Sequence, residues 1–228
     1  MSYILEGIKR AALLLANGDP EVFSAVLLSL RVSATSLALA SAVGVPLAFI
    51  IAAHKFPGRR FLTMVLNTLM ALPTVVVGLT VYALISRQGP LGVLGLLYTP
   101  KAMILGQVIL ATPIVSALTL AAIENVDPRA RETALTLGGG MMHSSLAVLR
   151  EARFAVMAAV AAGFGRVIAE VGSAMMLGGN IRGATRTMST AIALETAKGE
   201  FGLGIALGAI LLTVAFSINV AFHYWQKR

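Results

Sequence analysis

The chain has 228 residues, of which 57% are hydrophobic and only 12% are charged, so it is far more apolar than soluble domains. It contains no cysteine, which excludes disulfides, thiolate metal sites and cysteine nucleophiles. The net charge of +8 follows from the scarcity of acidic residues and requires no nucleic-acid partner. We expect one all-α membrane domain that covers residues 1–228 and leaves no room for a soluble catalytic domain.

The amino-terminal segment, up to Asp19, could be mistaken for a signal sequence. Its apolar stretch is short, however, and Glu6, Lys9 and Arg10 interrupt it. It also lacks a small-residue cleavage pattern followed by a soluble domain. We therefore predict an amphipathic helix that lies in the membrane interface.

Five apolar runs are long enough to cross a bilayer, which takes roughly 20 residues. We predict about five transmembrane helices, at residues 32–53, 61–85, 102–123, 154–177 and 203–222. The apolar stretch after Pro20 is too long for one crossing, and Arg31 is expected to mark the start of the first span. Pro46, Pro73 and Pro113 lie inside the runs and predict kinks, which are either ordinary bends or hinges around a pathway.

The distribution of Lys and Arg predicts the orientation in the membrane, because these residues are enriched in short cytoplasmic connections. With the amino terminus outside, the inner connections and carboxyl terminus carry nine of them, and the outer segments carry seven spread over more residues. We therefore expect a cytoplasmic carboxyl terminus and a cytoplasmic segment at residues 125–153.

The segment 125–153 is polar and is broken by glycine, between the third and fourth apolar runs. Asp127 followed by Pro128 predicts a helix start, and Ala130, Ala134, Leu135 and Leu137 then form a mostly apolar stripe. The glycines at 138–140 should end this helix, and residues 141–150 should form a second one. No Gly-Lys-Ser/Thr follows the glycines, so we expect no ATP site in this chain.

These residues resemble the cytoplasmic loop of permease subunits of binding-protein-dependent ABC importers. Glu132-Thr133-Ala134, three further residues and Gly138 match the Glu-Ala-Ala and Gly core of that loop, with Thr133 in place of the first alanine. Glu151 stands roughly where many members have proline. The resemblance implies that short coupling helices dock into a cleft on a separate ATPase subunit. The coupling residues implied are Arg131, Glu132, Thr133, Ala134, Leu137 and Gly138.

The resemblance extends to the substrate class. The run GFGRVIAEVGSAMMLGGNIRGATRTMSTAIALE, at 163–195, looks like molybdate-type permeases, and with RETALTLG and VLREARFAV the chain looks closest to tungstate permeases. This implies a homodimer in the bacterial or archaeal cytoplasmic membrane, bound to two ATPase subunits and an extracytoplasmic oxyanion-binding protein, with no cofactor. Tungstate is the first choice of substrate, molybdate the next, and sulfate or phosphate follow.

Four polar residues are candidates for the anion pathway or its gate. Arg166 and Glu170 are four residues apart within an apolar run, so they share a helix face and can pair. They form either a self-neutralised structural pair, at the bundle interior or a dimer seam, or part of an anion route. Asn180 and Arg182 lie in the outer connection and could receive an anion from a binding protein, or belong to a solvated loop.

Two other function classes stay open. A stand-alone secondary transporter or channel needs coupling-ion sites or a selectivity ring within the membrane, and only Arg166 and Glu170 offer ionisable groups there. An intramembrane enzyme needs a catalytic set or a metal site, and three scattered histidines with one deep acid do not supply either. We therefore expect a transport subunit with no catalytic and no metal-binding residues.

Overall fold

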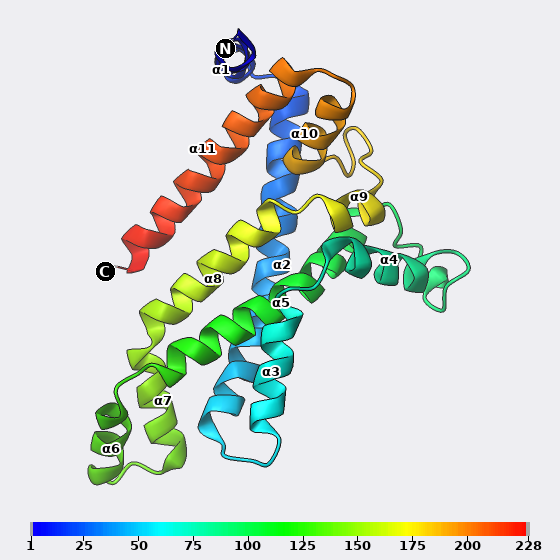
Figure 1. Ribbon diagram of the computed structural model, residues 1–228. Coiled ribbons are helices and arrows are strands. Elements are labelled where there is room, and N and C mark those ends of the chain that lie inside the picture. Colours follow the sequence, from blue (N-terminus) through cyan, green and yellow to red (C-terminus); the bar gives the residue numbers. More distant parts are fainter. Residues whose placement is uncertain (1, 227–228) are drawn as a thin grey trace.

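The computed structural model describes residues 2–226, and this part of the chain folds into helices with no β-strand (Figure 1). The helices are α1 (Ser2–Ala16), α2 (Pro20–Ala53), α3 (Arg59–Leu69), α4 (Thr74–Ile85), the 3-10 helix η1 (Gly92–Leu94), α5 (Pro100–Glu124), α6 (Pro128–Thr136), α7 (Met141–Glu151), α8 (Arg153–Ile168), α9 (Gly172–Gly178), α10 (Met188–Ala197) and α11 (Phe201–Gln226). The predicted all-α fold is confirmed.

The described helices account for three to five membrane spans. Helices α2, α5 and α11 are each long and apolar enough to cross a bilayer, and two bent pairs, α3 with α4 and α8 with α9, pass the same test together. The prediction of about five spans therefore agrees with the structure. The two bent pairs are not straight helices, however, because the axes turn by 96° between α3 and α4 and by 58° between α8 and α9.

The two bends have different local causes. Pro73 has no N–H to donate and stands as the N-cap of α4, so the helix stops before it and starts again after it. The break between α8 and α9 contains no proline. There, the buried carboxylate of Glu170 accepts a hydrogen bond from the backbone N–H of Ser173 at 3.0 Å, which caps the new helix.

The first long helix differs from the expectation at its start. Asp19 caps α2 by accepting from the backbone N–H groups of Glu21 and Val22, so the helix begins at Pro20 and runs without a break through Arg31, which is exposed. Its 34 residues span about 51 Å at the α-helical rise. Arg31 is therefore not a helix boundary, and the span predicted at residues 32–53 is part of a longer helix.

The core lies where α2 crosses α5, the helix pair in most extensive contact. At Gly44 an added Cβ would lie 3.0 Å from Oγ of Ser116 on α5, so the absence of a side chain lets the two helices approach closely, and a larger residue would require α5 to shift slightly. Further apolar clusters join α2 and α5 to α3, and to α8 and α11. Helix α1 packs on α11 and lies across the end of the bundle opposite α6 and α7 (Figure 1).

Candidate functional site

The segment after α5 forms the two short helices expected from its sequence. The carboxylate of Asp127 accepts from the backbone N–H of Arg129 at 2.9 Å, and Pro128 is the first residue of α6. Gly138 has a φ of +82°, in the left-handed region that glycine adopts at a helix end. The backbone N–H of Gly139 then bonds to the carbonyl of Ala134 at 2.9 Å, and α7 starts at Met141.

The predicted coupling residues divide into two groups by their exposure. Glu132, Thr133, Leu137 and Gly138 are exposed, and Leu137 has 83% of its surface accessible. Arg131 and Ala134 are half-buried. Leu137 is the C-cap of α6, and an apolar side chain as exposed as this one, next to a short helix at one end of the bundle, is the type of anchor that enters a groove on a partner.

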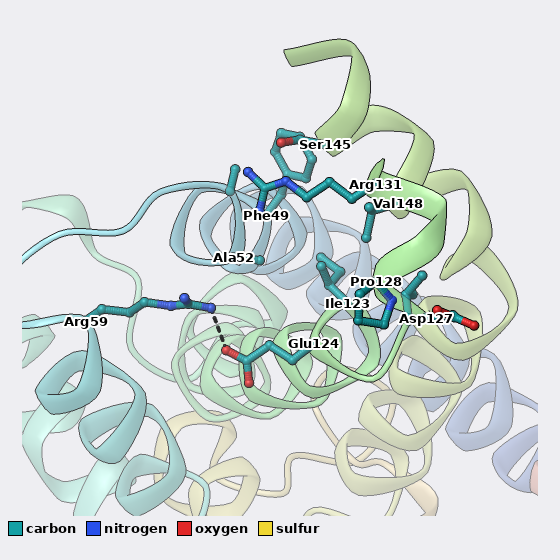
Figure 2. Close-up of a pocket in the computed structure, with 12 residues that line it drawn as sticks. Phe49, Ala52, Arg59, Ile123, Glu124, Asp127, Pro128, Arg131, Ser145 and Val148 are labelled. Atoms are coloured by element: carbon teal, nitrogen blue, oxygen red, sulfur yellow. Dashed lines mark hydrogen bonds and ion pairs between the residues drawn. The ribbon is translucent and has the colours of Figure 1, made fainter. Parts of the chain in front are cut away.

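Arg131 belongs to a cleft rather than to the outer surface of α6. This cleft has a volume of about 370 Å³ and lies between α6 and α7 on one side and the ends of α2, α3 and α5 on the other (Figure 2). Its lining includes Phe49, Ala52, Arg59, Glu124, Arg131 and Val148. Arg59 and Glu124 form an ion pair at 2.7 Å across the ends of α3 and α5.

The buried acid at the second bend is fully engaged. Glu170 has 3% of its surface exposed. One carboxylate oxygen accepts from Ser173, and the other accepts from Arg166 at 3.1 Å, so the expected pair forms. Ser189 also donates its hydroxyl to the backbone carbonyl of Glu170 at 2.7 Å. Glu170 thus holds α8, α9 and the start of α10 together, while the Arg166 side chain is 43% exposed.

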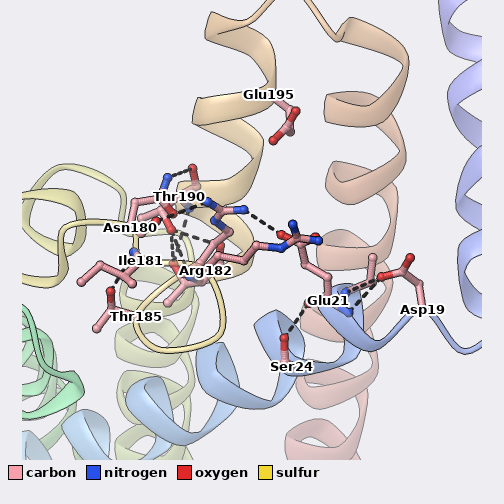
Figure 3. A network of polar contacts seen from close by, with 12 residues as sticks. Asp19, Glu21, Ser24, Asn180, Ile181, Arg182, Thr185, Thr190 and Glu195 are labelled. Atoms are coloured by element: carbon pink, nitrogen blue, oxygen red, sulfur yellow. Dashed lines mark hydrogen bonds and ion pairs between the residues drawn. The ribbon is translucent and has the colours of Figure 1, made fainter.

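Asn180 and Arg182 lie in a polar network at the opposite end from α6 (Figure 3). Arg182 and Arg186 both donate to Glu21, at 2.5 Å and 2.7 Å, one to each carboxylate oxygen. Arg186 also donates to the backbone carbonyl of Asn180 at 3.5 Å, and the Asn180 amide donates to the carbonyl of Thr190 at 3.4 Å. The network ties the loop between α9 and α10 to the first turn of α2.

Glu21 is the acid of this network, and the sequence did not point to it. It stands in the first turn of α2, where an acid is common because it complements the helix dipole. Nothing in the sequence connects Glu21 with the arginines that it binds, because they lie far along the chain. Arg186 is 165 positions away. The available signal was that the chain has only ten acidic residues and that one of them, Glu21, lies beside the start of a helix.

The sequence of the chain is similar to those of known transport proteins. The family described as "Binding-protein-dependent transport system inner membrane component" matches residues 44–228. The chain is 46% identical over 227 residues to the tungstate uptake system permease protein TupB of Campylobacter jejuni, which covers 100% of this chain and 95% of that protein. It is 39% identical to TupB of Peptoclostridium acidaminophilum, over 100% of both chains.

A solved structure shares the fold. An amino acid ABC transporter, crystallised with histidines, superimposes with a TM-score of 0.69 over 95% of this chain and 97% of the other, at 15% sequence identity. At this identity the likeness concerns the fold alone. The family match over residues 44–228 and the 46% identity to a permease protein establish that this chain belongs to the inner membrane components of binding-protein-dependent transport systems.

Proposed function

We propose that this chain is the permease subunit of an ATP-driven ABC importer that carries tungstate across the cytoplasmic membrane by alternating access. The observation that carries the proposal is the 46% identity, over the whole chain, to a tungstate uptake permease. The proposed substrate is an oxyanion, and molybdate is the alternative to tungstate. The chain itself transports and does not hydrolyse ATP, which is the role of a separate ATPase subunit.

The partners follow from the same proposal. Two copies of the chain form a homodimer, and each copy binds one ATPase subunit through α6 and α7. An extracytoplasmic oxyanion-binding protein delivers the substrate at the other end, near α1 and α10. The orientation has the amino terminus outside and the carboxyl terminus inside. It is supported by the positions of α1 and α6 at opposite ends of the bundle (Figure 1).

Helix α6 is the proposed coupling element. Glu132 and Thr133 are exposed on it, and Leu137 and Gly138 are exposed at its end, whereas Arg131 and Ala134 are half-buried. Docking of α6 in a groove of the ATPase would transmit the closure of the ATPase subunits to the bundle. Coupling of this kind requires that ATP and the loaded binding protein bind some states of the permease more tightly than others.

The roles of the four pathway candidates remain part of the proposal. Arg166 is 43% exposed and can face an anion, while its neighbour Glu170 acts as a helix cap and keeps the local charge balanced. Arg182 pairs with Glu21 through one nitrogen, but its side chain is 73% exposed, so its other N–H groups can meet an incoming anion. Asn180 supports the loop that carries Arg182.

Reconstitution of the complete transporter tests the proposal. The chain, its ATPase subunit and its binding protein are placed in liposomes, and ATP-dependent uptake of tungstate, molybdate and sulfate is measured. We expect tungstate uptake that requires ATP, both partners and a binding protein that prefers tungstate to sulfate. Uptake by the chain alone, with no ATPase subunit, would contradict the importer assignment, and equal affinity of the binding protein for sulfate would contradict the choice of tungstate.

A further inference from the structure

Helix α3 carries a polar face in a region where an apolar one is expected. Together with α4 it forms a stretch that is apolar enough for a membrane span. It packs against α5 and the end of α2 through Leu62, Leu66 and Met70. The opposite side carries Arg60, Thr63, Asn67 and Thr68, with Arg60, Asn67 and Thr68 exposed.

These polar residues line a shallow depression with a volume of about 880 Å³. Its lining comprises Phe56, Gly58, Arg59, Arg60, Thr63, Met64, Asn67, Thr68 and Glu124. Because Glu124 is neutralised by Arg59 at 2.7 Å, and Arg60 has no ion pair with a described residue, the depression has a surplus positive charge. An anion would be attracted to it.

Among the uncharged polar residues that line the depression, Asn67 has N–H donors that are not used in a hydrogen bond. The hydroxyls of Thr63 and Thr68 donate to backbone carbonyls of their own helix, at 3.1 Å and 2.9 Å. The side-chain amide of Asn67 makes no hydrogen bond with any residue that the structure describes. An unsatisfied amide is costly in hydrocarbon, so Asn67 is expected to face water or an anion rather than lipid.

A second asparagine in a membrane helix shows the contrast. Asn219 on α11 is also exposed, but its amide donates to the carbonyl of Ala215, one turn back, at 3.1 Å. That bond satisfies one donor within the helix and lowers the cost of facing lipid. Asn67 has no comparable bond, although a carbonyl one turn back is present in any helix.

We propose that Asn67 donates a hydrogen bond to the oxyanion during transport, in the half of the pathway that adjoins the coupling helices, with Arg60 at the mouth. The proposal rests on the proposed import of an oxyanion and extends it to a residue and a helix face. Asn67 lies two turns of α3, about 12 Å along the axis, from Arg59 and the cleft beside α6. A neutral donor suits this position because a transported ion must bind weakly enough to leave again, whereas a second arginine would retain a dianion.

The test uses the reconstituted transporter with its ATPase subunit and tungstate-loaded binding protein. The variants are Asn67→Ala, Asn67→Asp and Asn67→Gln, with Asn219→Ala as the matched control. Two rates are measured, the initial uptake of tungstate and the ATP hydrolysis stimulated by the loaded binding protein. Their ratio separates a defect in the pathway from a defect in coupling.

We expect Asn67→Ala to lower the uptake per ATP hydrolysed by about tenfold, since a hydrogen bond to a charged group is lost. Asn67→Asp should lower it further because a carboxylate repels the anion. Asn67→Gln should recover much of the rate, and Asn219→Ala should match the wild type. If the Asn67→Ala variant does not assemble into a transporter, the comparison of Asn67→Asp with Asn67→Gln tests the inference instead.

Two results would overturn the inference. One is uptake per ATP by Asn67→Ala equal to that of the wild type, and the other is an Asn67→Gln variant as impaired as Asn67→Asp. A failure of the proposed function looks different, because the wild-type transporter would then move no tungstate. In that case the same variants are compared with the oxyanion that the binding protein does deliver.

Discussion

The carboxylate of Glu170 lies 3.0 Å from the backbone N–H of Ser173 and caps the first turn of α9. The same side chain accepts from Arg166 at 3.1 Å and is almost completely buried. A buried carboxylate is tolerated only when it is hydrogen-bonded and its charge is balanced. The bend of 58° between α8 and α9 is therefore stabilised by an acid, and not by a proline.

Replacement of Glu170 should separate this cap from the ion pair. We expect Glu170→Ala to lower the free energy of unfolding by about 2 kcal/mol, because the Ser173 N–H loses a charged acceptor. Glu170→Gln keeps an acceptor and should recover part of the loss. Arg166→Ala should cost at least as much as Glu170→Ala, because it leaves the buried Glu170 carboxylate without its balancing charge. Thermal unfolding in detergent measures all three. An Arg166→Ala variant as stable as the wild type would show that the hydrogen bond to Ser173, and not the ion pair, holds the bend.

The network at Glu21 should hold the loop between α9 and α10. Glu21→Gln removes the charge that Arg182 and Arg186 share, and we expect a loss of about 1 kcal/mol, since the groups are partly exposed and solvent screens them. Proteolysis or hydrogen exchange of residues 180–187 should increase. Glu195→Gln is the control because it breaks the nearby pair of Glu195 and Lys198, at 2.9 Å, without touching that loop. Equal exchange in the two variants would contradict the role of Glu21.

Gly138 should be sensitive to substitution for a conformational reason. An added Cβ there meets nothing within 4 Å, but φ is +82°, so Gly138→Ala is strained by about 1 kcal/mol and should shift the end of α6. Gly140 also has open space around it and a φ of −67°, which alanine adopts freely. We expect reduced coupled ATP hydrolysis for Gly138→Ala and wild-type hydrolysis for Gly140→Ala. Similar activity in both would show that the end of α6 is not constrained.

Two exposed glutamates test which residues contact the ATPase subunit. Glu132 lies on α6 within the segment that resembles the importer loop, and Glu151 is the last residue of α7. We expect Glu132→Ala to lower transport and coupled ATP hydrolysis about tenfold, as is common for an anchor at an interface centre. Glu151→Ala should stay within about twofold of the wild type, as expected at an interface rim. The chain should insert into the membrane normally in both cases. Undiminished uptake by the Glu132→Ala variant would show that Glu132 does not contact the ATPase subunit.

Sequence alone predicted the features that depend on near neighbours in the chain. The apolar runs predicted the membrane helices because hydrophobic length is a local property. Asp127 with Pro128 predicted the start of α6, and Gly138 predicted its end, because caps and left-handed residues act within one turn. The proline at 73 predicted a kink but not its angle of 96°, which depends on the packing of α4 against α9.

The tertiary structure decided the contacts between distant segments and the direction in which side chains point. Glu21 meets Arg182 and Arg186 only because the loop after α9 returns to the start of α2. Arg131 faces a cleft beside α2 and α5, although it adjoins Glu132, which is exposed. Asn67 and Asn219 are both exposed asparagines on helices, but only the amide of Asn219 donates to a carbonyl of its own helix. Whether a side chain has a hydrogen-bond partner depends on which donors and acceptors the fold brings within about 3 Å of each other. A sequence pattern does not contain that information.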